Sequence, residues 1–169
     1  MICFYKPVYL NCLKITRDNS VAEDLTHDVF VRAFKYKTNY DPQHKFIFWL
    51  IKISTNVCLT YLNKKSKERY RNVYIEELDC EAGNMKQLHD ALVDKKAGLV
   101  IEEKFENELV EEAILLLPLP YRIPVVYKYY YDMSYEEIAK MLDKPIGTIK
   151  FRLNRAKRQL AIMLMPLFE

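Results

Sequence analysis

Apolar residues recur at helical spacing along most of the chain, and the pattern is clearest in residues 134–160, SYEEIAKMLDKPIGTIKFRLNRAKRQL. Four of these residues fall at i, i+3, i+4 and i+7, the apolar stripe of a short amphipathic helix: Tyr135, Ile138, Ala139 and Leu142. Ser134 and Glu137 have the spacing of a capping box, which predicts that the helix begins after Ser134. Pro145 disfavours helical backbone at the residue before it, so the helix is expected to end there.

The helical pattern resumes directly after this turn and predicts a second helix from about Ile146. Its apolar residues share one face: Ile149, Leu153, Ala156 and Leu160. The other faces carry five cations and no carboxylate, and they supply the candidate DNA-binding residues: Thr148, Lys150, Phe151, Arg152, Asn154, Arg155, Lys157 and Arg158. Two short helices across a tight turn are typical of a helix-turn-helix, whose second helix reads the major groove. The alternative is a solvated basic face on a structural helix, which the lack of acidic residues disfavours.

The N-terminal part begins with a moderately helical pattern in residues 1–17, which Asp18-Asn19-Ser20 interrupts. Ser20 and Glu23 have capping-box spacing and predict the start of the helix AEDLTHDVFVRAFKY. Its apolar face consists of Ala22, Leu25, Val29 and Ala33, with Phe30 and Phe34 beside it. Its other side carries Glu23, Asp24, His27 and Asp28. This acidic side suits a basic partner helix and repels nucleic acid, although first-turn carboxylates also interact favourably with a helix dipole.

No second histidine or cysteine follows His27 at i+3 or i+4, so we predict no metal site.

Residues 37–71, KTNYDPQHKFIFWLIKISTNVCLTYLNKKSKERYR, predict a long helix that starts at Asp41-Pro42. Its apolar stripe consists of Phe46, Trp49, Leu50, Ile53, Val57, Tyr61 and Leu62. Aromatic and basic residues alternate here, as in single-stranded DNA-binding surfaces. An aromatic stripe is also typical of a core, and Phe46, Trp49 and Ile53 are expected to be mainly core. The helix ends in cations suited to DNA phosphates: Lys64, Lys65, Lys67, Arg69 and Arg71.

Two further helices are predicted ahead of the helix-turn-helix. One spans residues 106–117 and is ended by Pro118 and Pro120. The other spans residues 121–131, with Val125, Val126 and Tyr129 facing inward. The sequence therefore predicts an all-α protein.

Charge and composition divide this all-α chain into two small helical domains. Half of the 169 residues are hydrophobic and three are glycine, which disfavours a loop-rich or β-rich fold. Net charge is +7 over residues 1–71, −8 over 72–112 and +4 over 113–169. Two basic modules on either side of an acidic connector indicate domains 1–71 and 106–169 and a flexible acidic linker, 72–105. The alternative is that the acidic stretch is the solvated surface of one domain.

Several function classes find no support in the sequence. No apolar run approaches the roughly 18 residues of a spanning helix, and we expect a cytoplasmic protein with no membrane insertion of its own. The four cysteines are irregularly spaced without a C-x-x-C pair, and we expect reduced thiols. No glycine-rich nucleotide loop, metal-spaced cluster or nucleophile–base pair is found, so we expect neither catalysis nor a cofactor.

The helix-turn-helix resembles the C-terminal DNA-binding region of bacterial sigma factors of the extracytoplasmic-function (ECF) group, S-[YF]-x-E-I-A-x-x-L-G-x-x-x-G-T-[VI]-[KR]-[SR]-R-[LI]-x-R-[AG]-[KR]. Two positions depart from it. Asp143 replaces a common glycine, and aspartate tolerates the left-handed backbone better than most residues. Phe151 replaces a small polar residue and can contact a thymine methyl group, so an unusual promoter sequence is expected.

Earlier segments are similar to other parts of the same family. Residues 22–30 resemble A-E-D-L-x-Q-[ED]-x-F, which docks on the β′ clamp helices of core RNA polymerase. The resemblance assigns polymerase binding to Asp24, Leu25, His27, Asp28 and Phe30. Residues 46–56 resemble F-x-x-W-L-x-x-I-[AS]-x-N, the part that melts and reads the −10 element, with Tyr40 and Asn56 at positions of a flipped-base pocket.

Residues 117–125 match L-P-x-x-Y-R-x-x-V of the same family, and the resemblance covers roughly 4–71 and 106–164. It implies a sigma factor that directs core RNA polymerase to promoter DNA, with an anti-sigma factor as a further partner. The −10 contacts are then assigned to Tyr40, Lys45, Trp49, Lys52, Asn56, Lys64 and Lys65, and the −35 contacts to the second helix of the helix-turn-helix. The alternatives are a free-standing helix-turn-helix regulator and a DNA-processing enzyme with an appended helix-turn-helix.

Overall fold

The computed structural model describes residues 2–69 and 103–165, and every regular element in these two ranges is helical. The chain divides into two compact units, Met1–Ile75 and Glu76–Glu169. The predicted all-α class is therefore confirmed. Residues 72–102 of the predicted linker lie outside the described residues.

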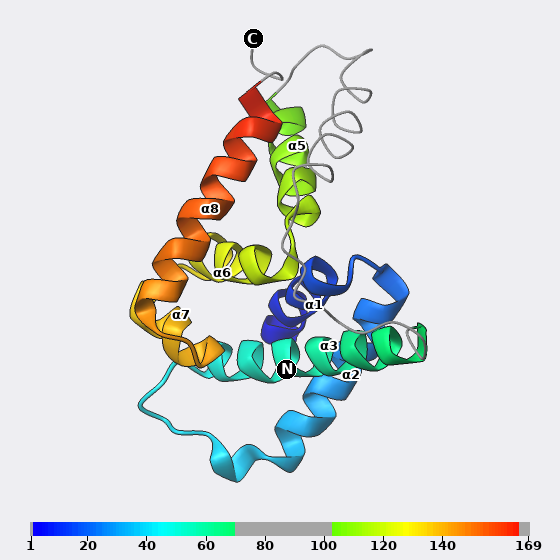
Figure 1. Ribbon diagram of the computed structural model, residues 1–169. Helices are drawn as coiled ribbons and strands as arrows, with labels where there is room; N and C mark the ends of the chain where they lie inside the picture. Colours follow the sequence, from blue (N-terminus) through cyan, green and yellow to red (C-terminus); the bar gives the residue numbers. More distant parts are fainter. Residues whose placement is uncertain (1, 70–102, 166–169) are drawn as a thin grey trace. The chain divides into compact units, whose positions relative to one another are not determined.

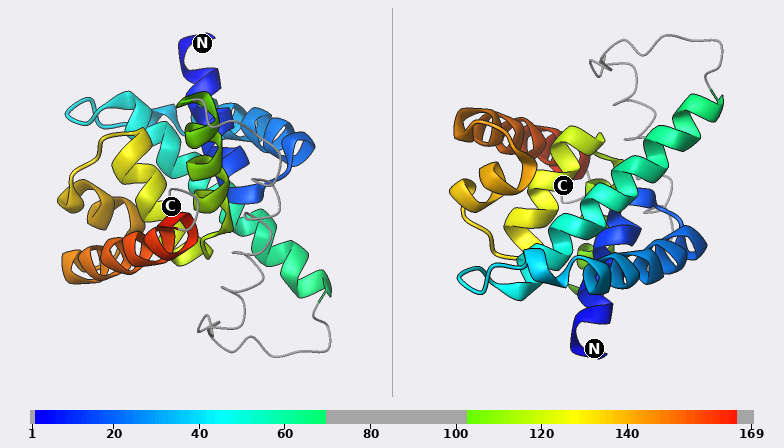
Figure 2. Two further views of the ribbon diagram at one scale, coloured as in Figure 1. Left: turned by 90° about the horizontal axis from the view of Figure 1, so that it is seen from above. Right: turned by 90° about the horizontal axis from the view of Figure 1, so that it is seen from below.

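Unit 1 consists of three long helices that pack pairwise against one another (Figures 1 and 2). These are α1 (Ile2–Thr16), α2 (Asn19–Lys35) and α3 (Phe46–Arg69), and a short 3₁₀ helix, η1 (Lys37–Asn39), follows α2. The predicted apolar face of α2 is buried, as Ala22, Leu25, Val29 and Ala33 show. It meets Val8, Cys12 and Ile15 of α1 and Leu50, Ile51, Val57 and Cys58 of α3 in the core.

Polar groups inside this core join α1 to α3. The Asn11 side-chain amide donates to the Ser54 hydroxyl at 2.7 Å and to the Thr55 hydroxyl at 3.1 Å. The buried thiols of Cys12 and Cys58 are free and hydrogen-bonded to each other, and this bond together with burial raises the pKa of Cys58. The raised pKa keeps the Cys58 thiol neutral, and a neutral, buried thiol is a poor nucleophile.

The start of α2 differs from the prediction, because its N-cap is Asp18 and not Ser20. The Asp18 carboxylate accepts a hydrogen bond from the Val21 amide at 3.1 Å, with extended backbone at φ −141° and ψ 118°. Arg17 adopts a left-handed φ of 60°, which reverses the chain immediately before the cap. Ser20 consequently lies inside the first turn, where its hydroxyl is too late to cap the helix.

The start of α3 was also placed too early, at Asp41-Pro42. Asp41 instead forms a tight turn, in which its carboxylate accepts from the Gln43 amide at 3.0 Å and its carbonyl accepts from the His44 amide at 3.1 Å. Helix α3 begins at Phe46, which is 37% exposed because it lies at the open end of the helix bundle. Trp49 and Ile53 are partly buried, so the expectation that these three residues are mainly core is wrong for Phe46 only.

Within the described residues, the stretch Phe46–Lys67 of α3 is long and apolar enough to meet the length and composition criteria for a membrane span. The sequence predicted no spanning helix, because charged and polar residues interrupt its apolar runs. A single such helix is weak evidence, because core helices of soluble proteins meet the same criteria. Helix α3 packs on α1 and α2 through one face, which carries the hydrogen-bonded Ser54 and Thr55.

Unit 2 contains α5 (Glu103–Leu116), α6 (Leu119–Tyr130), α7 (Tyr135–Leu142) and α8 (Ile146–Leu164). Helix α8 contacts the other three, with α5 beside its C-terminal part and α7 at its N-terminal end (Figure 1). The buried Arg122 donates from Nε and Nη2 to the Leu117 carbonyl at 2.9 and 2.6 Å, and so satisfies the C-terminal end of α5. Val125 and Val126 are buried as predicted. Tyr129 is 56% exposed, contrary to the prediction, and Tyr127 occupies the core instead.

Candidate nucleic-acid and protein interfaces

Local hydrogen bonds define both ends of α7 and the turn that leads into α8. The predicted capping box is present, since the Glu137 amide donates to the Ser134 hydroxyl at 3.1 Å and the Ser134 amide donates to the Glu137 carboxylate at 2.7 Å. Asp143 adopts the left-handed conformation at φ 51° and ψ 52°, as expected for the residue that replaces glycine there. The Lys144 amide then bonds to the Ala139 carbonyl at 3.0 Å, and Pro145 is the N-cap of α8.

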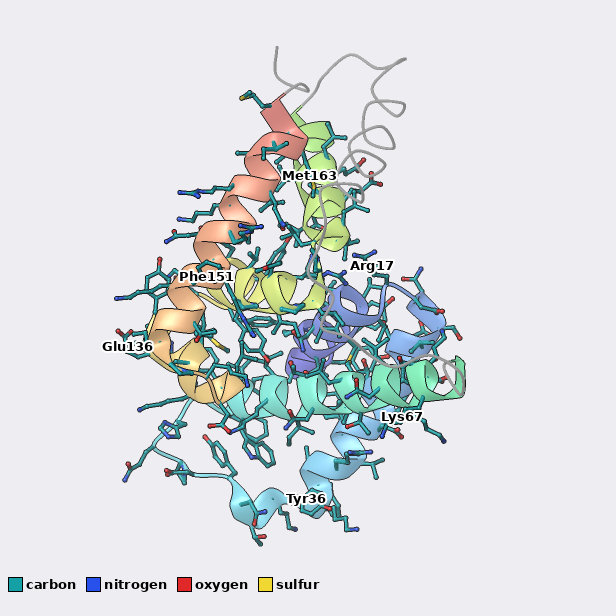
Figure 3. All side chains as sticks on the ribbon, viewed as in Figure 1. Arg17, Tyr36, Lys67, Glu136, Phe151 and Met163 are labelled. Carbon is teal, nitrogen blue, oxygen red and sulfur yellow. The ribbon has the colours of Figure 1, made fainter. Side chains whose placement is uncertain are left out.

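The candidate DNA-binding residues on α8 lie around its solvent side. Ile149, Leu153 and Ala156 are buried against the rest of unit 2, and nitrogen-tipped side chains project from the opposite side of the helix (Figure 3). Six of the predicted residues are exposed: Lys150, Phe151, Asn154, Arg155, Lys157 and Arg158. Thr148 and Arg152 are half-buried at the edge of the packed face. The exposed surface is thus positive, with one large apolar group, the 61% exposed Phe151, among the cations.

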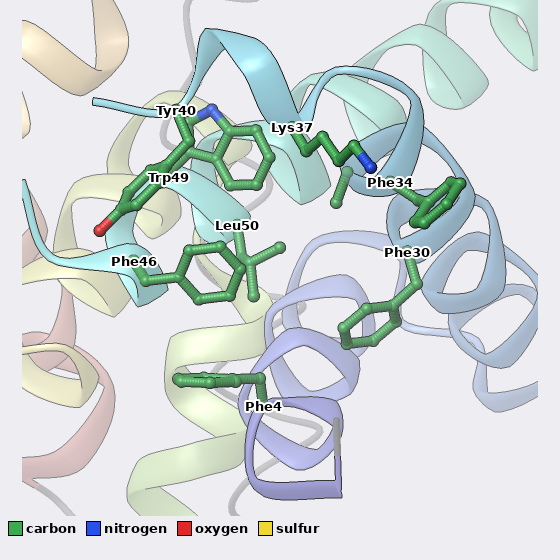
Figure 4. A pocket seen from close by; sticks show the side chains of 9 residues that line it. Phe4, Phe30, Phe34, Lys37, Tyr40, Phe46, Trp49 and Leu50 are labelled. Carbon is green, nitrogen blue, oxygen red and sulfur yellow. The ribbon is translucent and has the colours of Figure 1, made fainter. Parts of the chain in front are cut away.

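An aromatic pocket of about 350 Å³ opens in unit 1 between α1, α2 and α3 (Figure 4). It is lined by Phe4, Phe30, Ala33, Phe34, Lys37, Tyr40, Phe46, Trp49 and Leu50. Three of these rings contact one another. The centroid of the Tyr40 ring lies 5.1 Å from that of Phe46 and 5.5 Å from that of Trp49, and the Phe46 and Trp49 centroids are 5.5 Å apart. The Tyr40 hydroxyl donates to the His44 carbonyl at 2.8 Å, which fixes its ring at the pocket wall.

The structure brings some of the predicted −10 residues together and separates others. Tyr40 and Trp49 share the pocket, whereas Asn56 lies two turns further along α3, about 10 Å from Trp49, and does not line it. Lys52 and Asn56 are exposed within about 60° of Trp49 around the helix. Lys64 is also about 60° from Trp49, but Lys65 is about 160° away and lies over the Tyr61 ring at 5.7 Å. Lys45 Nζ lies over the Phe48 ring at 5.1 Å.

Several pocket residues were missed by the sequence analysis. Phe4 comes from α1 and Phe34 from α2, and tertiary packing alone brings them to Trp49. Lys37 Nζ lies 4.8 Å from the centroid of the Phe34 ring and is the charged group of the pocket lining. The alternation of aromatic and basic residues over 34–37 was a usable signal for this pair, whereas Phe4 has none.

The acidic side of α2 is accessible to a partner. Asp24, His27 and Asp28 are exposed, and Phe30 is half-buried between this side and the pocket. Leu25 is 7% exposed and belongs to the core, so it supports the helix from inside and is not available for direct contact. Among the residues that the structure describes, no group of three His, Cys, Asp or Glu side chains could hold a metal ion.

Comparisons with known proteins match both units to one family. Residues 3–68 match "Sigma-70 region 2" and residues 107–160 match "Sigma-70, region 4". The chain is 28% identical over 160 residues to the ECF RNA polymerase sigma factor SigW of Bacillus subtilis, covering 95% of this chain and 84% of that protein. The chain is also 28% identical over 155 residues to the ECF RNA polymerase sigma factor SigE of Mycolicibacterium smegmatis, and this alignment covers 90% of the chain and 55% of that protein.

The fold is likewise similar to a solved sigma factor. The sigma factor RpoE in complex with the anti-sigma factor NepR, from Bartonella quintana, matches with a TM-score of 0.70 over 97% of this chain and 93% of that one, at 20% identity. The match to region 2 accounts for unit 1, which a free-standing helix-turn-helix regulator would leave unexplained. The chain therefore belongs to the ECF group of the sigma-70 family and is a sigma factor that directs RNA polymerase in the initiation of transcription.

Proposed function

We propose that the two units divide promoter recognition between them, with residues 1–71 binding core RNA polymerase and the −10 element and residues 106–169 binding the −35 element. Residues 72–105 connect the two modules. The observation that carries this division is the solvent side of α8, which has four exposed cations, a fifth (Arg152) at its edge and no carboxylate, and which follows a capped helix across a tight turn. Duplex DNA is the partner that such a face suits best.

The candidate DNA-binding residues of α8 have different roles, which depend on where each lies around the helix relative to its buried face. Arg155 and Arg158 lie opposite the buried face and reach base edges, where arginine pairs with guanine through two hydrogen bonds. Lys150 and Lys157 lie on one shoulder of the helix and contact phosphates, which adds affinity without sequence choice. Phe151 contacts a thymine methyl group and makes the preferred −35 sequence depart from that of relatives with a small polar residue there.

In unit 1, the aromatic pocket holds an unpaired base of the opened −10 element. Its walls offer faces for stacking, and Lys37 at its rim attracts the phosphate backbone. Extruding a base costs a few kcal/mol, which stacking on Tyr40 and Trp49 offsets. Lys52, Asn56 and Lys64 continue the same side of α3 and guide the strand, whereas Lys65 points away from it.

Polymerase binding is assigned to α2. Asp24 and Asp28 are exposed carboxylates on a segment with no Lys or Arg between Arg17 and Arg32, and this charge suits the β′ clamp helices of the core enzyme. The chain itself catalyses no reaction in this scheme, and it acts in the cytoplasm with the polymerase. An anti-sigma factor is a second partner, because the similar RpoE of Bartonella quintana was solved with one bound.

The division of roles is tested with reconstituted holoenzyme on one promoter. Arg155→Ala should weaken closed-complex formation on duplex DNA and have little effect on a template whose −10 region is already open. Trp49→Ala should slow promoter opening, measured by permanganate reactivity of unpaired thymines, and leave −35 binding unchanged. Lys64→Ala and Lys65→Ala are a matched pair, and the former alone should reduce open-complex stability. Equal effects of Arg155→Ala and Trp49→Ala at both steps would contradict the proposal.

A further inference from the structure

Two of the docking residues on α2, His27 and Phe30, contact a tyrosine of α1 that the docking motif does not include. The Tyr5 ring is parallel to the Phe30 ring, with centroids 6.2 Å apart and an interplanar angle of 4°. The same ring is edge-on to His27, at 6.2 Å and 63°. Both geometries are within the range of favourable aromatic pairs. The docking surface therefore continues from α2 onto α1.

Tyr5 is held in this position from its other side as well. The Tyr9 ring, one turn later in α1, is parallel to the Tyr5 ring at 6.3 Å and 5°. The Tyr9 hydroxyl donates to Asn19 Oδ1 at 3.3 Å, at the first residue of α2. The row Tyr9–Tyr5–Phe30 is thus connected to α2 at both ends. Side chains ordered before binding lose less entropy when a partner arrives, which favours affinity.

The surroundings of this row indicate the charge of the partner. Tyr5 is 39% exposed, and residues 18–31 hold four carboxylates and no Lys or Arg. His27 is one turn from both Glu23 and Asp24 on α2, so the aromatic row runs beside the acidic side. An aromatic face next to carboxylates suits a Lys or Arg side chain, whose stem packs on the ring while its charge meets the acids.

We propose that Tyr5 extends the docking surface of α2 onto α1 and, with Phe30, receives the side chain of a Lys or Arg from a basic helix of core RNA polymerase. This inference rests on the proposed docking role of α2. Neither DNA nor a second copy of the chain fits the same surface, because the phosphates and the equivalent acidic face would be repelled.

The affinity of the full chain for core polymerase tests the proposal, measured by fluorescence anisotropy of labelled protein. Tyr5→Ala should weaken binding roughly tenfold, because tyrosine is enriched among the interface residues whose truncation costs the most affinity. Tyr5→Phe keeps the ring and should bind within about twofold of the unchanged chain. Tyr36→Ala is the matched control, because Tyr36 is also an exposed tyrosine of unit 1, at 46%, and should leave the affinity unchanged.

The variant Tyr5→Arg distinguishes loss of a contact with the polymerase from loss of the packing of unit 1. Its planar guanidinium can cover the Phe30 ring, so the packing between α1 and α2 is retained, but it adds a cation that repels a basic helix. Binding should fall at low salt and recover in part as salt is raised, because screening weakens the repulsion. If Tyr5→Ala lowers the helix content, its loss of affinity could come from misfolding, and the affinity of Tyr5→Arg then decides whether Tyr5 contacts the polymerase.

Asp28→Lys distinguishes failure of this inference from failure of the docking role itself. If Asp28→Lys loses affinity while Tyr5→Ala and Tyr5→Arg bind like the unchanged chain, Tyr5 is no part of the surface. Normal binding by Asp28→Lys would remove the docking role of α2 and the inference with it. Altered self-association in sedimentation, at unchanged core affinity, would assign the surface to a second copy and also overturn the proposal.

Discussion

Replacing Ser134 by alanine should loosen the first turn of α7 by an amount that follows from one hydrogen bond. The Ser134 hydroxyl accepts from the Glu137 amide at 3.1 Å, and alanine leaves that amide to water. Loss of such a cap costs about 1 kcal/mol, within a range of roughly 0.5–2 kcal/mol. Since about 1.4 kcal/mol corresponds to a tenfold change, the fraction of open α7 should rise about fivefold. Helix α7 has eight residues, so this is a large share of its local stability.

Amide hydrogen exchange of residues 135–142 measures this opening directly, in the full chain. Ser134→Ala should raise the exchange rate about fivefold, whereas Ser134→Thr keeps the hydroxyl and should stay near the original rate. Glu137→Gln is a second conservative control, because glutamine also completes a capping box. Unchanged exchange in Ser134→Ala, or an equal rise in Ser134→Thr, would refute the assignment of the cap.

Three further outcomes follow from the structure. Asp18→Ala should lower the stability of unit 1 by about 1 kcal/mol in thermal unfolding, whereas Ser20→Ala should change it by less than about 0.5 kcal/mol. A larger loss of stability in Ser20→Ala than in Asp18→Ala would show that Ser20 is the N-cap. Arg155→Ala should weaken binding to the correct −35 sequence by about 1–3 kcal/mol in a mobility-shift titration, and an equal loss on every DNA sequence would make it a phosphate contact. Burial and the neighbouring Glu111 carboxylate raise the pKa of Tyr130 to about 12. The phenol of the unfolded chain ionises near pH 10, so the protonated Tyr130 contributes stability below about pH 10 that is lost between about pH 10 and 12. Thermal unfolding of Tyr130→Phe should therefore show a smaller loss of stability over this pH range than thermal unfolding of the unchanged chain. An identical dependence of stability on pH in the two proteins would contradict the raised pKa.

Features that depend on contiguous residues were predictable from the sequence. The capping box of α7 involves only Ser134 to Glu137, and helical periodicity alone determines that Phe151 and Arg155 are exposed while Ile149 is buried. Two acceptors two residues apart competed at the start of α2, however. The left-handed Arg17 turns the chain so that Asp18, and not Ser20, faces the free amides, and no local pattern encodes that choice.

Features that depend on packing between helices were not predictable. Phe4 and Trp49 are 45 positions apart in the sequence and line one pocket because α1 packs on α3. Phe46 has the spacing of a core residue, but as the first residue of α3 it has no neighbouring turn to cover it. Tyr5 carries no motif at all, and its place beside His27 and Phe30 follows from the packing of α1 on α2. Such residues become candidates once the three-helix arrangement is known.

Run-off transcription with purified core RNA polymerase on fragments of the host genome tests the central claim most directly. Addition of this protein should produce discrete new transcripts, and alignment of the DNA upstream of their start points should reveal two shared promoter elements. Arg155→Ala should reduce these transcripts by impairing the upstream element. If the protein bound duplex DNA but neither joined the core enzyme nor started transcripts, the roles assigned to α2 and to the aromatic pocket would be wrong.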